Sequence, residues 1–188
     1  MDAGVRYSVT PDITLVAGVF EISKPFFDRD PTNLFTQVGS LRHRGIEVSL
    51  SGQPLEGLKI VTGAMLLQAR VSGSIVDQGL IGNVPPGRVP MLIRFDADYA
   101  AWRGFSINAK INFDSSHYAN RINTLRISSS TVLDMGIRYN FKILESAASI
   151  RLDAKNLTNA YDWTVKGSSG QYSPTAPRRY TARFAIDF

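Results

Sequence analysis

Strict two-residue alternation of apolar and polar side chains is the feature that most constrains this chain. From Phe105 to Asp114, phenylalanine, isoleucine and alanine take every odd position, and serine, asparagine, lysine and aspartate take every even one. Successive side chains of a β-strand point to opposite faces, whereas a helix would mix these two sets. The same alternation recurs elsewhere and predicts four strands, each with one apolar and one polar face: Val89–Tyr99, Phe105–Asp114, Thr131–Lys142 and Arg179–Phe188.

Five weaker strands bring the predicted number to nine. Short turns and long polar loops alternate between the nine strands, as in a transmembrane barrel with tight periplasmic turns and longer extracellular loops. The weaker strands are roughly Gly4–Thr10, Ile13–Ser23, Leu34–Gly52, Leu58–Val71 and Ala148–Leu157; the turns lie near residues 11–12, 53–57, 101–104 and 144–146; the long loops are 24–33, 72–87, 115–128 and 158–178.

The main alternative to a membrane barrel is a soluble β-sandwich, which also alternates apolar and polar residues. Aromatic residues such as Tyr99 and Phe105 flank the short turns on the apolar face, which is typical of an interfacial aromatic girdle. The predicted strands also exceed the usual soluble length of about five or six residues. The polar faces carry midstrand charges that suit a wet lumen better than a dry core, namely Arg94, Lys110, Asp134, Arg138 and Asp153.

Composition removes several other classes of protein. With 44% apolar and 20% charged residues among 188, the chain is not disordered, and it has no uninterrupted apolar run of the roughly 18 residues that a membrane helix needs. The absence of cysteine excludes disulfides and thiolate chemistry. The net charge of +5 is scattered along the chain, so nucleic-acid binding is not expected.

Strand parity predicts that these nine strands are part of a larger barrel. Single-chain bacterial barrels have an even number of strands and return both termini to the periplasm. Nine strands break this rule, unless Leu34–Gly52 conceals a tenth. The residues after Met1 also lack a signal peptide, so we expect an exported form to have further sequence before them.

Four stretches resemble the TonB-dependent outer-membrane receptors, in particular ferric-siderophore receptors. The most specific is Asp153–Tyr161, which is similar to the family's penultimate strand, where an Asn-Leu pair is followed by an aromatic residue. The end of the chain, Pro177–Phe188, resembles the family's last strand with its Pro-Arg start and terminal phenylalanine. The other two stretches are Gly39–Gly52, with an Arg-Gly-apolar-Glu pattern, and Val84–Pro90, which looks like a loop preceding a barrel strand.

The resemblance implies an all-β, antiparallel, up-and-down transmembrane β-barrel of 22 strands in the bacterial outer membrane. Residues 1–188 would be its C-terminal part, with the plug domain and the N-terminal strands absent. The implied function is energised uptake of a ferric siderophore, with iron present only as part of that ligand and no cofactor. The implied partners are the siderophore, the TonB complex through the missing N-terminal part, the barrel-assembly machinery and outer-membrane lipid.

Two other functions are compatible with part of the sequence. A passive porin or adhesin barrel would share the alternation but lack the Asn156-Leu157 and Pro177-Arg178 patterns. A rim protease would use acidic residues with a histidine, and Asp114 precedes His117 at a loop edge. The sequence has no Gly-x-Ser-x-Gly elbow, phosphate-binding glycine loop or His-Glu-x-x-His motif, so no enzymatic activity is expected.

Ligand contacts are expected from aromatic and arginine side chains in the long loops. Ferric siderophores are bulky, often anionic and partly aromatic, so ring faces and guanidinium groups suit them. The alternative for each residue is packing against neighbouring loops. The candidates for ligand binding are Phe26, Phe27, His117, Tyr118, Arg121, Trp163 and Tyr172, and the residues that resemble an assembly signal are Tyr180, Phe184, Ile186 and Phe188.

Overall fold

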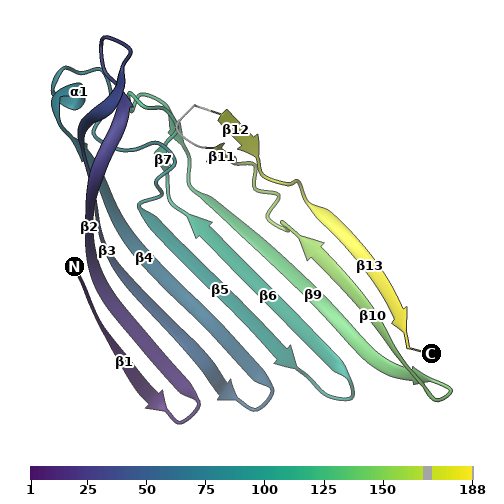
Figure 1. Cartoon of the computed structure of the whole chain (residues 1–188). Helices are drawn as coiled ribbons and strands as arrows, with labels where there is room; N and C mark the ends of the chain where they lie inside the picture. The colour runs from purple at the N-terminus through teal and green to yellow at the C-terminus, as the bar shows by residue number, and fades with distance from the viewer. Residues whose placement is uncertain (167–170, 188) are drawn as a thin grey trace.

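The chain forms one curved, antiparallel nine-stranded sheet (Figure 1). This computed structural model describes residues 1–166 and 171–187. Each long strand pairs with the next long strand along the chain, so the predicted up-and-down order and the count of nine are both confirmed. The strands are β1 (Asp2–Thr10), β2 (Ile13–Arg29), β3 (Phe35–Leu55), β4 (Leu58–Ser72), β5 (Met91–Ala100), β6 (Phe105–Asp114), β9 (Ser130–Ile143), β10 (Ser146–Lys155) and β13 (Arg179–Ile186).

Pairing register sorts the side chains into an apolar face and a charged face. Val19 lies opposite Ile46, and Ile46 lies opposite Leu66, so these three apolar side chains form one row across β2, β3 and β4. Ile46 is 55% exposed, and most large apolar residues of this face are exposed as well. The charged face instead carries the ion pairs Lys110–Asp96 at 2.8 Å, Lys155–Asp134 at 3.1 Å and Arg151–Asp153 at 2.8 Å.

Aromatic rings stack beside the short turns, as the sequence predicts. The ring of Phe105 lies 4.3 Å from that of Tyr139, its register partner on β9. Tyr139 stacks in turn on Phe141 at 5.4 Å, and Trp102 of the adjacent turn lies 6.2 Å from Phe105. The four rings therefore contact one another in sequence. They lie near the tight turns, which are together at one end of the sheet (Figure 1).

The glycine of the Arg-Gly-apolar-Glu pattern has a packing role. Phe20 lies opposite Gly45 in the register of β2 and β3, and its ring covers the glycine. A Cβ atom on Gly45 would lie only 2.3 Å from Cζ of Phe20. Any larger residue at this position would displace the ring, which explains why glycine stands in the middle of a strand.

The structure corrects the predicted end of the second strand. β2 continues to Arg29 rather than ending at Ser23, so most of the predicted loop 24–33 is strand, with a bulge between Phe26 and Phe27. The tight turn that follows is held by Asp30, whose carboxylate accepts hydrogen bonds from the backbone of Thr32 and Leu34 at 2.8 and 3.0 Å. A hydrogen bond from the Thr32 hydroxyl, together with these two backbone bonds, lowers the pKa of Asp30.

Two other predicted strands have different bounds for backbone reasons. The strand predicted from Val89 begins at Met91, because Pro90 has no N–H to donate to a ladder. Its carbonyl still accepts a hydrogen bond from Leu67 at 2.7 Å. The strand predicted to reach Leu157 ends at Lys155, because Asn156 adopts a left-handed conformation with φ of 51°.

The long loops contain short elements that the sequence did not predict. They carry α1 (Ser74–Asp77) and two small hairpins, β7 (His117–Tyr118) with β8 (Arg126–Ile127), and β11 (Trp163–Lys166) with β12 (Gln171–Pro174). Among the described residues, no helix is long and apolar enough to cross a membrane.

A small hydrophobic core lies at the end of the sheet with the long loops, where α1 covers β3 and β4 (Figure 1). Ile75 of α1 is buried against these strands, and Phe26 packs against the same cluster. The helix and its flanking loop are thereby anchored by burial rather than left in solvent. The buried members of this core are Val38, Leu41, Val71, Ile75 and Ile81.

Charge placed on the apolar face should destabilise the barrel, whereas the same charge one residue away should not. We expect Ile111→Arg, in the middle of β6, to cost about 2–4 kcal/mol in a bilayer, as charges do at a membrane midplane. Asn112→Arg, on the charged face of the same strand, is the matched control and should cost less than about 1 kcal/mol. Urea unfolding in lipid vesicles measures the free energy of unfolding of both variants. Equal costs would mean that the two faces are exposed to the same solvent.

Candidate ligand-binding site in the long loops

Backbone hydrogen bonds join the loop of residues 73–90 to the loop of residues 115–129. The amide of Gly82 donates to the carbonyl of Arg121, and the amide of Gly87 donates to the carbonyl of Tyr118, each at 2.8 Å. Between these two bonds, the side chain of Asn123 bonds both polar backbone groups of Val84. Its Oδ1 accepts from the amide at 2.9 Å, and its Nδ2 donates to the carbonyl at 2.7 Å.

These contacts, which we call the loop clamp, require a glycine at residue 82. A Cβ atom there would lie 2.0 Å from Oδ1 of Asn123. Asn123 itself has a φ of 57°, a conformation that asparagine tolerates better than most residues. The loop clamp is made by Gly82, Val84 and Gly87 on one loop and by Tyr118, Arg121 and Asn123 on the other.

The remaining long loops attach to the clamp through side chains. Arg121 forms an ion pair with Asp28 near the end of β2. Tyr172 of β12 donates its hydroxyl to the carbonyl of Ala119 at 3.2 Å. The Ser130 hydroxyl donates to the carboxylate of Asp162 at 2.5 Å. The described parts of all four long connections therefore form one connected layer above the sheet.

Aromatic side chains from this layer line a pocket of about 400 Å³. Tyr161 and Trp163 meet edge to face with ring centroids 5.6 Å apart, and Tyr172 comes from the opposite strand of the β11–β12 hairpin. Tyr161 is 71% exposed and Trp163 is 41% exposed, so ring surface is available to a ligand. Arg126 also lines the pocket, while its guanidinium group lies 5.1 Å from the centroid of Tyr118 and donates to the Ser116 hydroxyl at 2.9 Å. We call this the aromatic pocket.

A second pocket of about 300 Å³ is lined in part by residues of the clamp, namely Gly82, Val84, Gly87 and Arg121. It is lined by Phe26 and the Asp28–Arg121 ion pair, together with Arg88 and Val165. Phe26 also packs against the buried core, so its position is fixed by packing whether or not a ligand is present.

The sequence candidates are therefore distributed over different places. Trp163 and Tyr172 share the aromatic pocket, and Phe26 shares the second pocket with Arg121. Phe27 points to the face of β2 opposite Phe26 and stacks on Phe35 at 6.1 Å. His117 and Tyr118 line a third cavity, where His117 is buried with Nδ1 3.3 Å from the carbonyl of Ser115.

Sequence reasoning missed two members of the aromatic pocket. Tyr161 stands two residues before Trp163, and that spacing places both rings near one another in an extended segment. Arg126 pairs with Tyr118 across the β7–β8 hairpin, which the loop sequence did not reveal.

The assembly-signal candidates lie on the apolar face of the last strand. Tyr180, Phe184 and Ile186 alternate along β13, and Phe184 lies opposite Ile150 of β10. Tyr180 and Phe184 are exposed, at 67% and 58%. Phe188 lies outside the described residues.

The residues considered for a rim protease are engaged in other contacts. Asp114 forms an ion pair with Arg94 at 2.5 Å. A second acidic residue, Asp162, does line the same cavity of about 150 Å³ as Asp114 and His117, but its carboxylate accepts from Ser130 and from the amide of Trp163. Over residues 1–166 and 171–187, no cluster of histidine, aspartate or glutamate is suited to hold a metal ion.

Comparison with known proteins decides the family. The family model described as "TonB dependent receptor-like, beta-barrel" matches residues 1–157. The chain belongs to this family of TonB-dependent receptor β-barrels. The ferrichrome receptor FcuA of Yersinia enterocolitica is 29% identical over 174 residues, which are 90% of this chain and 23% of that receptor. The ferrioxamine receptor of the same organism is 23% identical over 132 residues, which are 69% of this chain and 18% of that receptor.

Solved structures of receptors share the fold. BauA, the ferric preacinetobactin receptor of Acinetobacter baumannii, matches with a TM-score of 0.84 at 27% identity, over 100% of this chain and 29% of BauA. The siderophore receptor PiuA of Acinetobacter baumannii matches with a TM-score of 0.81 at 18% identity, over 98% of this chain and 27% of PiuA, and shows the fold alone. The chain thus spans about a quarter of the length of these relatives.

Family membership assigns the two faces of the sheet. TonB-dependent receptors are barrels of the bacterial outer membrane and are receptors, not enzymes. The apolar face is therefore the outward face toward lipid, and the charged face lines the lumen. The long loops emerge on the extracellular side, and the aromatic pocket lies on that side with them.

Removing the Asn123 side chain should loosen the loop clamp without affecting the sheet. Asn123→Ala deletes two hydrogen bonds to Val84, each of which contributes about 0.5–1.5 kcal/mol. We expect the amides of Gly82, Val84 and Gly87 to exchange with deuterium about tenfold faster or more, while amides of β6 and β9 keep their rates. Asn120→Ala is the matched control, because the Asn120 side chain bonds Thr124 and Leu125 within its own loop and the variant keeps the Asn120 carbonyl, which accepts from Asn123. Equal acceleration in both variants would contradict the clamp.

Proposed function

We propose that this chain is the closing part of a receptor barrel that takes up a ferric siderophore across the outer membrane. The observation that carries the proposal is the aromatic pocket on the extracellular side, with the exposed rings of Tyr161 and Trp163 and with Arg126 among its lining residues. The relatives support it, because their names describe receptors for ferrichrome, ferrioxamine and ferric preacinetobactin.

The chemistry of the aromatic pocket suits a bulky, anionic and partly unsaturated ligand. Ring faces contribute stacking energy, and a guanidinium group adds charge-assisted hydrogen bonds to carboxylate, catecholate or hydroxamate oxygens. Arg88 and Arg121 of the second pocket carry the same charge. A ligand that spans both pockets would contact loops that the clamp already holds together.

The open sheet supports a larger barrel as the working unit. β1 and β13 are the two edges of the sheet, and an edge facing hydrocarbon leaves backbone groups without hydrogen-bond partners. We propose that about thirteen further strands close a 22-stranded barrel around a plug, as in large outer-membrane transporters. Energisation by TonB would act through that plug, and Tyr180, Phe184 and Ile186 would present the apolar pattern that the barrel-assembly machinery recognises.

Aromatic truncation in the pocket should weaken ligand binding. We expect Trp163→Ala with Tyr172→Ala to raise the Kd for a ferric siderophore at least about tenfold, since each lost aromatic contact contributes about 0.5–1.5 kcal/mol beyond its buried area. Isothermal titration calorimetry on the complete barrel, with ferric hydroxamate and ferric catecholate probes, measures the change. Phe27→Ala, an aromatic truncation on the opposite face of β2, should leave the Kd unchanged, and a comparable loss there would point away from the aromatic pocket.

The genomic DNA before the codon for Met1 tests the larger barrel. We expect an in-frame signal peptide, a plug domain and sequence for about thirteen strands, because a 22-stranded wall is the size that encloses a plugged lumen. A stop codon with no plug domain before it would contradict the transport proposal but not the outer-membrane fold.

A further inference from the structure

Asn156 of the Asn-Leu pattern is buried at the point where β10 leaves the barrel wall. It is only 4% exposed, and its φ of 51° ends the strand at Lys155. Its side chain uses both donor positions and both acceptor positions of the amide group. Nδ2 donates to the carbonyls of Ala160 and Ala176 at 2.9 and 3.0 Å, and Oδ1 accepts from the amide of Ala160 at 2.9 Å and from the hydroxyl of Thr158 at 3.2 Å.

These bonds hold together the two ends of the loop that carries the aromatic pocket. Ala160 lies just before β11, and Ala176 lies just after β12. The two ends also pair with each other, because Asp162 donates its amide to the Thr175 hydroxyl at 3.0 Å and its carbonyl accepts from the Thr175 amide at 2.9 Å. The β11–β12 hairpin therefore starts and ends in a closed stem. We call residues 156–162 and 175–176 the loop stem.

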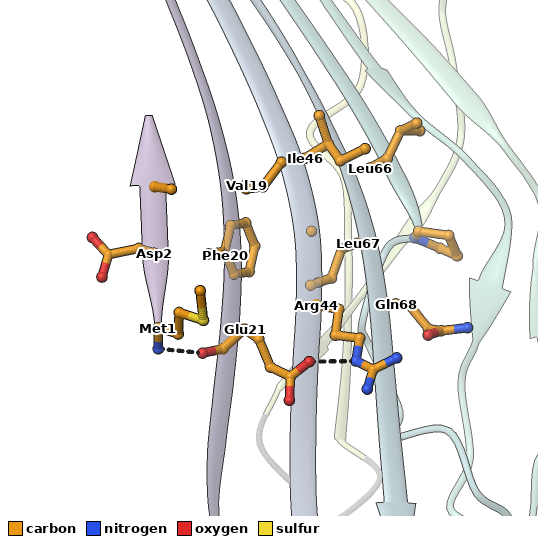
Figure 2. Close-up of a pocket in the computed structure, with 13 residues that line it drawn as sticks. Met1, Asp2, Val19, Phe20, Glu21, Arg44, Ile46, Leu66, Leu67 and Gln68 are labelled. Carbon is orange, nitrogen blue, oxygen red and sulfur yellow. Dashed lines mark hydrogen bonds and ion pairs between the residues drawn. The ribbon is translucent and has the colours of Figure 1, made fainter. Parts of the chain in front are cut away.

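The barrel wall and the β11–β12 hairpin place their side chains by different means. In the wall, backbone pairing aligns side chains in rows across neighbouring strands, as Figure 2 shows for Val19, Ile46 and Leu66. The hairpin is a separate two-stranded sheet. The position of its rings relative to the wall therefore depends on what the loop stem contacts.

Asn156 connects the loop stem to β9 of the wall. Its amide donates to Oδ1 of Asp134 at 2.8 Å. Leu157 continues the pairing, since its amide donates to the carbonyl of Leu133 at 2.7 Å. The side chain of Asn156 thus joins both ends of the loop to a backbone segment that is already bonded to the wall.

We propose that Asn156 is a positioning residue of the ligand site. By bonding both ends of the loop to a backbone fixed on β9, it sets where the rings of Trp163 and Tyr172 stand above the sheet. Asn156 does not line the aromatic pocket, so it acts on a ligand only through those rings. This role rests on the proposed function, since it presupposes that the aromatic pocket binds a siderophore.

A turn-forming role alone does not require these side-chain bonds. Glycine adopts a positive φ more readily than asparagine does. Asn156→Gly therefore keeps the turn and the amide bond to Asp134, and it removes only the side-chain bonds. Asn159→Gly is the matched control, because Asn159 has the same φ of 51° and its side chain makes no hydrogen bond within residues 1–166 and 171–187.

Hydrogen exchange in the complete barrel tests the connection between stem and wall. In Asn156→Gly we expect the amides of Ala160, Asp162 and Thr175 to exchange about tenfold faster or more, because several hydrogen bonds are lost at once. Amides of β6 should keep their rates, and Asn159→Gly should exchange as the wild type does. Heat-modifiable gel migration at the wild-type temperature shows that the barrel of each variant is intact.

A double-mutant cycle tests whether Asn156 acts through the rings. By isothermal titration calorimetry with ferric hydroxamate and ferric catecholate probes, Asn156→Gly should raise the Kd about tenfold or more. In a barrel that already carries Trp163→Ala and Tyr172→Ala, adding Asn156→Gly should change the Kd by less than about twofold, because the rings that it positions are gone. A purely structural role would make the two effects add.

The outcomes separate this role from the proposed function. Binding of neither probe by the wild-type barrel would overturn the proposed function, and with it the role of Asn156 at a ligand site. If the wild type binds a probe, then unchanged exchange in Asn156→Gly, an unchanged Kd or additive effects in the cycle would each overturn the positioning role alone.

Discussion

Every feature of this chain depends on the need to pair backbone hydrogen-bonding groups where no water can reach them. In hydrocarbon an unpaired N–H or C=O costs several kcal/mol, so each strand must be bonded on both sides. An antiparallel ladder between sequential strands meets this need with the shortest connections. Once the ladder is fixed, the two-residue period of the strand assigns one face to lipid and the other to the lumen. Apolar side chains therefore occupy the first face and charged side chains the second.

Beyond the membrane the same requirement is relaxed, because water can satisfy the backbone. β2 and β3 nevertheless continue as a paired hairpin to a turn capped by Asp30, and the other loops form their own small ladders. Asn123 extends this pairing with a side chain that imitates a neighbouring strand by bonding both backbone groups of Val84. The extracellular layer therefore pairs its backbone groups as the sheet does, with side chains taking the place of part of the backbone.

Sequence predicted the sheet better than the loops for a physical reason. Alternation is a local property, so Phe105–Asp114 and its counterparts reveal strand, face and order within one segment. The clamp joins residues 39 positions apart through one asparagine, and the sequence around Asn123 or Val84 contains no pattern that predicts this contact. Strand ends were also misjudged, as at Ser23, because a polar extension above the membrane no longer needs to alternate.

The candidate site shows the same difference between what local sequence predicts and what only the folded chain decides. Trp163 and Tyr172 were predicted from chemistry and share a pocket, since the β11–β12 hairpin brings them to one place. Phe27 was predicted on the same grounds and points elsewhere, because the parity of β2 decides its direction. The loop clamp also has an evolutionary consequence. Since residues 82–87 and 118–123 are joined backbone to backbone, the two loops cannot drift in length independently within those segments, so insertions that diversify the receptor are confined to the stretches outside them.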